Sequence, residues 1–522
     1  MTHHTQKIPF EKVNAFTSFF LDFVNQKESL RPFYQHYPKV ENFNAQIAEK
    51  STAYSAQTRK VLVDALHKQY EGLTLSEAVN TNLTLLAEKN TFTVTTGHQL
   101  NIFTGPLYFI YKIATVINAC KQLKAQYPEY NFIPVYWMAS EDHDYDEIKY
   151  FKLYGKKYVW ETQQQGAVGR FHTKEFETLL KDIPGNIDLF RKAYTKNTKL
   201  AGAARQYVNE LFAAEGLLIV DGDDKSLKNL LKDVIREDVF KHTTKQLVDK
   251  TNAGLEALGY KPQIYCRDIN FFYLEDGLRS RIEQKGEMFE VVDTDIKFTK
   301  QQLEQLIESN PDKFSPNVIL RPLYEEIILP NLGYCGGPAE VIYWLQLKDV
   351  FTHFSTPFPI LLPRNFGLVI DAPTARKIEK SELELEEIFL EKNYLFNHYI
   401  LKRSREKLTV NGERTLIEQQ FEKIKEQAER VDKSLSPLVA AETRRLVKSL
   451  EKIELKLLKA EKRHQSDKIR QIEAIKDTLF PGGSLQERSD NFLNFYQQDP
   501  DFIKKILQSF DPFDLRFNVL YL

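Results

Sequence analysis

The sequence is poor in cysteine, and the few cysteines lie far apart. Cys120, Cys266 and Cys335 are the only three in the chain. A disulfide framework needs an even and closely spaced set, and a zinc ribbon needs pairs a few positions apart. Neither class of protein is indicated, and we expect each thiol to be a small residue of the core.

An excess of charge of either sign is also missing. The chain has 71 lysines and arginines against 72 aspartates and glutamates, which favours neither nucleic acid nor a membrane surface as a partner. The opening residues, MTHHTQKIPFEK, lack the apolar core of a signal peptide, and no apolar run reaches membrane-spanning length. We therefore expect a cytoplasmic protein.

The chain is rich in residues that pack, and it is long. Hydrophobic residues make up 42% of it and aromatic residues 12%, which indicates a well-packed globular protein. Its 522 residues are too many for one simple core, so we expect two or three domains. Up to about Glu88 the pattern predicts helices.

The stretch from Phe92 to Lys112, FTVTTGHQLNIFTGPLYFIYK, predicts a strand, a glycine-punctuated loop and a helix. Pro106 suits a first helical position, and Thr104 or Gly105 suits the cap. The first turn of a helix offers unpaired N–H groups to an anion, so we expect the TGP turn to bind one. Lys112 either reaches back toward that anion or is solvated.

A second buried strand follows at residues 132–138, FIPVYWM, and it ends in SEDHDYDE at residues 140–147. One helix lies between the two strands, as in a right-handed crossover between parallel strands. Both strands then end at the same rim of the sheet. The sequence therefore predicts that TTGHQ and SEDHDYDE lie side by side.

The acidic cluster from Glu141 to Glu147 allows three interpretations. A group at the carboxyl end of a strand faces the substrate pocket of such a sheet, which favours His143 or Asp144 as a general base. Helix capping and hydrogen bonding within the loop form the second interpretation. The third is a divalent ion held by two or three of the side chains.

Further elements are expected along the chain. A third strand at residues 217–220 ends in DGDD, where Asp221 and Asp223 either cap the next helix or bind a ligand. Residues 150–160 predict a hairpin with Gly155 in its turn. Residues 261–300 predict a β-rich insertion, with strands at 264–266, 271–274 and 288–292.

A second dense stretch runs from residue 314 to residue 346, where the turn Gly336-Gly337-Pro338 leads into a helix. Arg321 is a natural clamp for a carboxylate or phosphate. The alternative is an ion pair of Arg321 with Glu325 or Glu326. Residues 360–364 predict one more strand, which ends in Arg364.

Apolar residues recur in steps of four and three between Ile417 and Leu438, and again between Leu446 and Ala460, which is heptad spacing. The pattern predicts a helical hairpin whose turn, or only a kink, lies near Pro437. Such an arm buries its apolar stripe in a partner, so we expect a homodimer. The closing residues 517–522 predict an edge strand on the first domain.

Four stretches resemble the BshC family, the cysteine-adding enzymes of bacillithiol biosynthesis: TTGHQLNIFTGPLYFIYKI, PVYWMASEDHDYDEI, FSPNVILRPLYEEIILPNLGYCGGPAEVIYWLQLK and LQERSDNFLNFY. The resemblance covers nearly the whole chain. It implies an α/β fold, in which a Rossmann-like core with a doubly wound parallel sheet carries inserted connecting segments and a long coiled-coil arm that dimerises. We place the core at residues 1–375 with insertions at about 150–200 and 260–310, the arm at 376–480, and a segment returning to the core at 481–522.

The resemblance also implies the activity, the joining of cysteine to glucosaminyl-malate by a ligase. The family typically has glutamine where this chain has His98, so we assign binding to Gln99 instead. Chemistry is assigned to Asp142, His143 and Asp144. Substrate binding is assigned to Thr96, Gly97, Gln99, Thr104, Gly105, Lys112, Trp137, Asn317, Arg321, Tyr334 and Gly337. A nucleotide, ATP or ADP, is expected near the root of the arm, at Arg364, Gly482, Gly483, Gln486 and Arg488.

In the mechanism that this resemblance implies, the amine of glucosaminyl-malate attacks an activated cysteine carboxyl. Asp144 or His143 takes the amine proton, and Arg321 or Lys112 holds the malate carboxylates. No metal is predicted. Two other functions stay open: a metal-dependent hydrolase or transferase built on the acidic cluster, and a non-catalytic dimeric binding protein.

Overall fold

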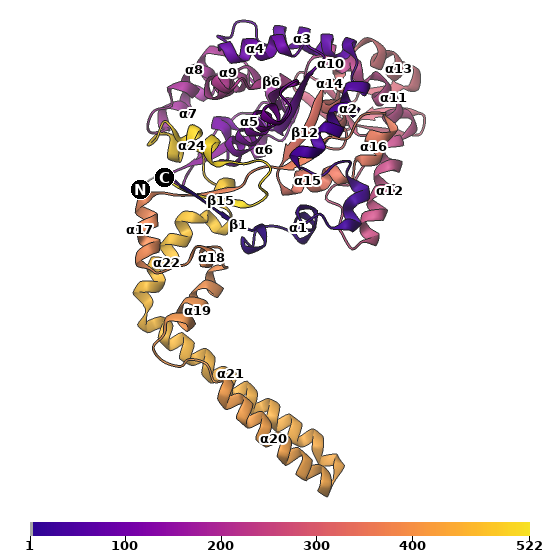
Figure 1. The fold of residues 1–522 in the computed structure, drawn as a ribbon. Helices are drawn as coiled ribbons and strands as arrows, with labels where there is room; N and C mark the ends of the chain where they lie inside the picture. The colour runs from indigo at the N-terminus through magenta and orange to yellow at the C-terminus, as the bar shows by residue number, and fades with distance from the viewer. Residues whose placement is uncertain (1–3) are drawn as a thin grey trace.

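The computed structural model describes residues 4–522, and a five-stranded sheet lies at its centre (Figure 1). The strand order is β6-β3-β2-β12-β13, and every neighbouring pair is parallel. In chain order these strands run 3-2-1-4-5, the Rossmann order, with the switch point between β2 and β12. The strands are β2 (Thr91–His98), β3 (Asn131–Met138), β6 (Leu218–Asp221), β12 (Asn331–Gly336) and β13 (Ile360–Pro363).

The central strands are buried on both faces, as the apolar run of β3 predicts. The threonines of β2 are buried too. The hydroxyls of Thr93 and Thr95 are satisfied there, because both donate hydrogen bonds to Oδ1 of Asn331, at 3.1 and 2.9 Å. These bonds join β2 to β12, the two strands at the switch point.

Helices cover the parallel sheet, and α5 (Tyr108–Gln126) makes the crossover from β2 to β3 (Figure 1). It begins two residues later than predicted, and its N-cap is Leu107. The other helices of the core are α1 (Ser18–Val24), α2 (Phe43–Ala53), α3 (Ala56–Gln69), α4 (Glu77–Leu85), α6 (Tyr145–Ile148), α7 (Phe176–Asp182), α8 (Asp188–Lys196), α9 (Leu200–Phe212), α10 (Lys225–Lys228), α11 (Lys232–Lys241), α12 (Thr243–Ala257), α13 (Lys300–Ser309), α14 (Arg321–Ile328), α15 (Pro338–Leu345), α16 (Lys348–His353), α23 (Leu493–Tyr496) and α24 (Phe502–Ser509).

Both predicted insertions combine β-strands with helices. The hairpin of β4 (Tyr150–Leu153) and β5 (Lys156–Val159) turns at Gly155, whose φ is +78°. An antiparallel sheet follows in the order β10-β9-β8-β7-β11. Its strands are β7 (Phe271–Glu275), β8 (Leu278–Lys285), β9 (Met288–Val291), β10 (Lys297–Thr299) and β11 (Phe314–Pro316). The strand predicted at residues 264–266 is wrong, since this stretch is irregular.

The two ends of the chain meet in a third sheet, of order β1-β15-β14. It consists of β1 (His4–Ile8), β14 (Gly367–Ile370) and β15 (Phe517–Tyr521). Two predictions are corrected here. The described residues begin with strand β1 rather than with a helix, and β15 is the middle strand of this separate sheet rather than an edge strand of the main one.

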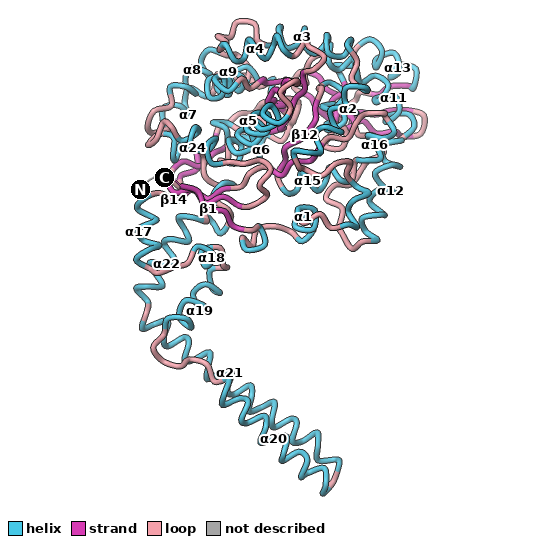
Figure 2. The backbone as a smooth tube through the Cα atoms, in the orientation of Figure 1, coloured by secondary structure: helices cyan, strands magenta, loops and turns pink. Residues whose placement is uncertain are grey.

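A long helical arm extends away from the core (Figures 1 and 2). Its elements are α17 (Ala372–Lys380), α18 (Leu385–Ile388), α19 (Lys392–Arg403), α20 (Asn411–Val431), α21 (Ser436–His464) and α22 (Ser466–Leu479). The break near Pro437 is a turn, because α20 and α21 fold back on each other along their lengths (Figure 1). No described helix is both long and apolar enough to cross a membrane.

Candidate functional site

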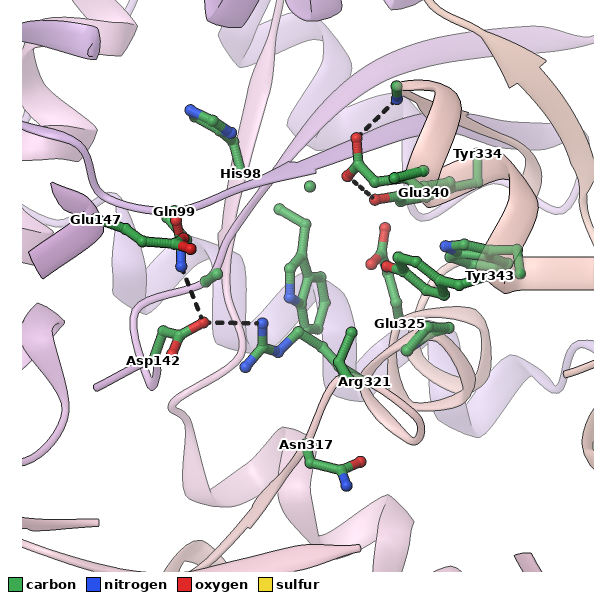
Figure 3. A pocket seen from close by; sticks show the side chains of 18 of the residues that line it. His98, Gln99, Asp142, Glu147, Asn317, Arg321, Glu325, Tyr334, Glu340 and Tyr343 are labelled. Carbon is green, nitrogen blue, oxygen red and sulfur yellow. Dashed lines mark hydrogen bonds and ion pairs between the residues drawn. The ribbon is translucent and has the colours of Figure 1, made fainter. Parts of the chain in front are cut away.

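A cavity of about 600 Å³ opens at the switch point between β2 and β12 (Figure 3). Its walls come from the end of β2, the loop after β3, the end of β12, α14 and the first turn of α15. Ligands of doubly wound sheets bind at this place. The predicted site residues that line the cavity are Gly97, Gln99, Lys112, Trp137, Asp142, His143, Asn317, Arg321, Tyr334, Gly337, Arg364 and Arg488.

Asp142 lies beside two guanidinium groups. Its Oδ2 accepts hydrogen bonds from Gln99 and Arg321, both at 3.4 Å, and its Oδ1 is 4.0 Å from Nη1 of Arg279. Burial by itself would raise the pKa of Asp142, but the two arginines outweigh burial and hold the pKa well below its usual range. Asp142 is therefore a poor proton acceptor, and it orients Arg321.

The His143 ring also meets Arg279, whose Nη1 donates to Nδ1 of His143 at 2.5 Å. Burial and the positive charge of Arg279 lower the pKa of His143, so the ring is neutral at pH 7. Asp144 does not line the cavity. Its carboxylate accepts the N–H of Glu147 at 3.3 Å and caps α6, so its position matches the capping interpretation rather than the predicted catalytic role.

The rest of the acidic cluster diverges. Glu141 points inward and forms a buried ion pair with Lys228 at 2.5 Å, whereas Asp146 is exposed and pairs with Lys149. Across residues 4–522, no group of three or more His, Cys, Asp and Glu side chains is placed to hold a metal ion. The cluster therefore does not assemble the ligand set that the hydrolase interpretation requires.

The acids after β6 belong to a buried network. Asp221 accepts a hydrogen bond from the Ser140 hydroxyl, and Asp223 forms an ion pair with Arg170 at 2.7 Å. Neither caps the next helix, because Asp224 accepts the two backbone N–H groups at the start of α10. Both interpretations offered for Asp221 and Asp223 are replaced by this structural role.

On the β12 side of the cavity, Lys112 is already neutralised. Its Nζ lies 2.7 Å from the carbonyl oxygen of Gly97 and 2.7 Å from Oε1 of Glu340. Glu340 also accepts hydrogen bonds from the Tyr334 hydroxyl at 3.0 Å and from the Gly337 N–H at 2.7 Å. The paired Lys112 is therefore a poor candidate for holding a ligand carboxylate.

Glu325 is a cavity residue that the sequence reasoning missed. It was considered only as a partner of Arg321, which pairs with Asp142 instead, and its neighbour Glu326 pairs with Lys50. Glu325 is 3% exposed, and within residues 4–522 its Oε1 has no hydrogen-bond partner. Burial, and then the charge of Glu326, raise the pKa of Glu325 well above its usual range. The only sequence signal is a pair of adjacent glutamates followed by apolar residues in α14.

The TGP turn is closed by the chain's own C-terminal segment. Leu107 donates its N–H to the carbonyl of Asp490, and Nδ2 of Asn491 donates to the carbonyls of Phe103 and Gly105 at 2.7 and 2.6 Å. Thr104 is buried and lines none of the cavities described here, and Gly105 faces only a small side cavity. The anion site predicted at this turn is therefore corrected, because protein groups fill it.

Of the remaining predicted residues, some line the cavity and others lie buried behind its lining. Trp137 lines the cavity and packs edge-on against Tyr324. Asn317 lines it too, and its Oδ1 accepts two backbone N–H groups that shape the loop before α14. Thr96 is buried behind the wall, where its hydroxyl donates to the carbonyl of Cys335 at 2.8 Å. A direct binding role for Thr96 does not match that position.

A second cavity, of about 650 Å³, lies at the root of the arm. Four residues of the predicted nucleotide site line it: Arg364, Gly482, Gly483 and Arg488. The fifth, Gln486, is structural, because its side-chain amide bonds to both backbone groups of Val369 at 2.8 and 3.0 Å. Phe16, Phe389 and Phe480 supply aromatic surface, on which a nucleotide base can stack. Of the two lysines in the lining, Lys392 pairs with two carboxylates and Lys476 donates to two backbone carbonyls.

Two arginines line both cavities. The charge of Arg364 is neutralised by Glu487. Arg488 is exposed, and its side chain has no ion-pair or hydrogen-bond partner in the part of the chain that the structure describes. It is therefore the arginine available to an anion at the junction of the two cavities.

Strand order, switch-point cavity and arm together define a Rossmann-like α/β protein with a polar small-molecule site and a coiled-coil appendage. The family model for the N-terminal Rossmann-like domain of bacillithiol biosynthesis BshC matches residues 3–365, and the model for its C-terminal coiled-coil domain matches residues 367–522. The chain therefore belongs to the BshC family.

Similar proteins are named "Putative cysteine ligase BshC". The one from Flavobacterium johnsoniae is 40% identical over 527 residues, which cover 99% of each chain. The one from Cytophaga hutchinsonii is 41% identical over 510 residues and 97% of each chain. A more distant relative from Chlorobaculum tepidum is 28% identical over 87% of each chain.

Proposed function

We propose that this protein is a cysteine ligase of bacillithiol biosynthesis, which forms an amide bond between cysteine and the amine of glucosaminyl-malate. The names of relatives that match along nearly the whole chain support a ligase reaction with cysteine. The observation that carries the proposal is the guanidinium group of Arg321, which lies beside Asp142 at the cavity of the Rossmann switch point.

The arginines suit the malate unit, which carries two carboxylates. A guanidinium group presents a planar fork of donors that matches a carboxylate. Arg321 meets Asp142 only at 3.4 Å, so donors remain for a ligand. Arg267 also lines the cavity, and within residues 4–522 its side chain makes no ion pair or hydrogen bond. We assign the malate carboxylates to this arginine side rather than to Lys112.

We assign ATP or ADP to the second cavity, whose aromatic and basic lining supports the assignment. When bound, ATP would supply the energy for activating the cysteine carboxyl. Arg488, which lines both cavities, is the residue we assign to anionic groups at their junction.

The arm supports a homodimer as the working form. Large apolar side chains remain exposed along α20 and α21. They include Leu416, Ile424, Leu438, Ile453 and Leu455. A second copy of the arm would cover them, as in other coiled coils. We also propose a cytoplasmic location, as expected for an enzyme that acts on free cysteine.

The test is mass-spectrometric thiol profiling of cells that lack the gene, complemented with wild type or with Arg321→Met. We expect deletion to remove the cysteinyl product and to accumulate glucosaminyl-malate, and we expect only the wild type to restore the thiol. Rescue by both forms would keep the ligase function and move its site elsewhere. Unchanged thiols after deletion would overturn the function itself.

One alternative is weaker on a particular observation. The hydrolase interpretation needs convergent metal ligands, and Glu141, Asp144 and Asp146 point to separate partners.

A further inference from the structure

Glu325 extends from α14 into the cavity, toward the Tyr334–Glu340 pair (Figure 3). A Cβ atom built on Gly97 would lie 3.9 Å from Oε2 of Glu325 and 3.3 Å from the Tyr334 hydroxyl. The absence of a side chain at Gly97 therefore keeps open the space in front of this carboxyl, at the end of β2.

The other carboxylates of the cavity are satisfied. Glu340 has Lys112, Tyr334 and a backbone N–H, and Asp142 has Gln99 and Arg321. Glu147 is exposed, so water solvates it. Among the carboxyl groups lining this cavity, all within residues 4–522, Glu325 alone combines burial with an oxygen that has no hydrogen-bond partner.

A buried carboxyl without a partner is costly to the fold, because it loses water and gains nothing in return. A ligand that donates hydrogen bonds, and above all a cation, replaces the hydrogen bonds to water that the carboxyl loses on burial. The charged and titratable groups that face Glu325 are Arg321 and Glu326 of α14, Lys112 of α5, Tyr334 of β12, and Glu340 and Tyr343 of α15. The two cations are each paired with another acid, so they leave this carboxyl open.

We propose that Glu325 receives the amino nitrogen of the substrate and is the base that accepts its proton. This inference rests on the proposed function, which makes glucosaminyl-malate the amine. One N–H bond of the substrate ammonium breaks, and its proton forms an O–H bond on a carboxylate oxygen of Glu325. The nitrogen keeps the electron pair and becomes the neutral amine that is able to attack a carbonyl carbon.

The geometry favours Glu325 over the residues first assigned to this step. Asp144 lies outside the cavity as a helix cap, and two arginines keep Asp142 a weak base. The Nδ1 atom of His143 is occupied by Arg279. Arginines on one side of the cavity and Glu325 on the other also match a substrate that carries carboxylates at one end and an amine at the other.

The first experiment measures protons exchanged on binding, by titration calorimetry in two buffers of different ionisation enthalpy. The probes are glucosaminyl-malate and its N-acetyl derivative, which has no basic nitrogen. Burial raises the pKa of Glu325 in the free protein, and an ammonium group bound beside the carboxyl would lower that pKa. We expect wild type to release up to one proton with the amine and none with the N-acetyl derivative.

The variants are Glu325→Gln, which keeps the shape and loses the base, and Glu325→Asp, which keeps a carboxyl. The control is Glu177→Gln on the surface of α7. We expect E325Q to bind without proton release, and E325D and E177Q to retain it. Thermal melting of each variant separates this effect from unfolding, since removal of an unpaired buried carboxyl should not lower the melting temperature.

The second readout is the pH profile of ligation. We expect E325Q to lower kcat by about 100-fold or more, within the usual range for a general base, and to lose the acidic limb of the profile. Proton release that persists in E325Q would overturn the assignment of Glu325 while leaving the ligase function intact. Failure of wild type to bind either probe would overturn the proposed function, and the inference with it.

Discussion

Nη2 of Arg364 donates to Oε1 of Glu487, and both side chains are almost fully buried, at 2% and 0% exposure. Oε2 of Glu487 accepts the N–H of Gly367 at 2.9 Å. This ion pair joins the loop after β13 to the C-terminal segment, in the wall between the two cavities. It therefore ties the root of the arm to the Rossmann core.

Removing one partner of this pair should destabilise the core strongly. In Glu487→Gln the guanidinium of Arg364 stays buried without a counter-charge, which typically costs about 3–5 kcal/mol. We expect a lower midpoint in denaturant unfolding. Glu386→Gln, at an exposed ion pair with Lys12, is the control and should stay within about 0.5 kcal/mol of wild type. Equal midpoints for both variants would contradict the role given to the pair.

Arg321→Met should weaken substrate binding more than it slows chemistry. Loss of charge-assisted hydrogen bonds to a carboxylate costs about 1.5–3 kcal/mol, which is roughly a 10- to 100-fold rise in KM for glucosaminyl-malate. Arg321→Lys keeps the charge without the planar fork, so its KM should lie between the KM of wild type and that of Arg321→Met. Steady-state kinetics of the purified protein checks this, with Lys313→Met outside the cavity as control. A fall in kcat at unchanged KM would count against a binding role.

Asp142→Asn tests the pH dependence of stability. The folded-state pKa of Asp142 lies below the ordinary value of 3.8, so its ionised form stabilises the fold above that pH. The contribution is lost as pH falls through the folded-state value. We expect the variant to unfold earlier than wild type at pH 7, and the difference to begin to narrow only below about pH 4. Denaturant midpoints between pH 7 and pH 3 measure this, and the exposed Asp146→Asn should follow wild type throughout.

Asn491→Ala should loosen the TGP turn. The substitution leaves the buried carbonyls of Phe103 and Gly105 without their donor, at about 1–3 kcal/mol for each unsatisfied group. We expect a lower melting temperature and faster hydrogen exchange at the start of α5. Gln498→Ala, whose amide makes only a long exposed bond, is the control in the same segment. Unchanged hydrogen exchange at the start of α5 would mean that the turn is stable without the contacts of Asn491.

Two aspartates introduced on the arm should dissociate the proposed homodimer. Leu416 and Leu455 are 61% and 66% exposed, so replacing both with aspartate leaves the hairpin intact and opposes burial against a second copy. We expect wild type to sediment as a dimer at micromolar concentration and the double variant as a monomer. Lys459→Asp controls for added negative charge. A monomeric wild type would discard the homodimer.

The parts of the fold that follow from local pattern could be predicted. The run FIPVYWM and the threonine-rich strand before TTGHQ are parallel neighbours, and the polar stretches after them meet at one rim. The heptad spacing likewise predicts the helical hairpin, because the period can be recognised in a continuous stretch of sequence. The pairing of β1 with β15 could not be predicted, since it joins residues about 500 positions apart and neither strand specifies the other.

The sequence predicts the location of the candidate site better than it predicts the role of each side chain there. Whether an acid is a base, a cap or an ion-pair partner depends on which neighbours the tertiary fold supplies. Asp144 became a cap through the turn that follows it, and Lys112 was neutralised by Glu340 from a distant helix. Glu325 escaped notice because its lack of a partner is a property of the packed structure.

The final segment has a consequence for how the protein is made. Glu487 and Asn491 complete the core loops, and β15 fills the middle of the sheet that joins both ends of the chain. On the ribosome, therefore, the Rossmann core emerges long before the residues that finish it. The helical hairpin of the arm is built from local contacts, whereas the loops around the candidate site are complete only once residues 487–491 have been made.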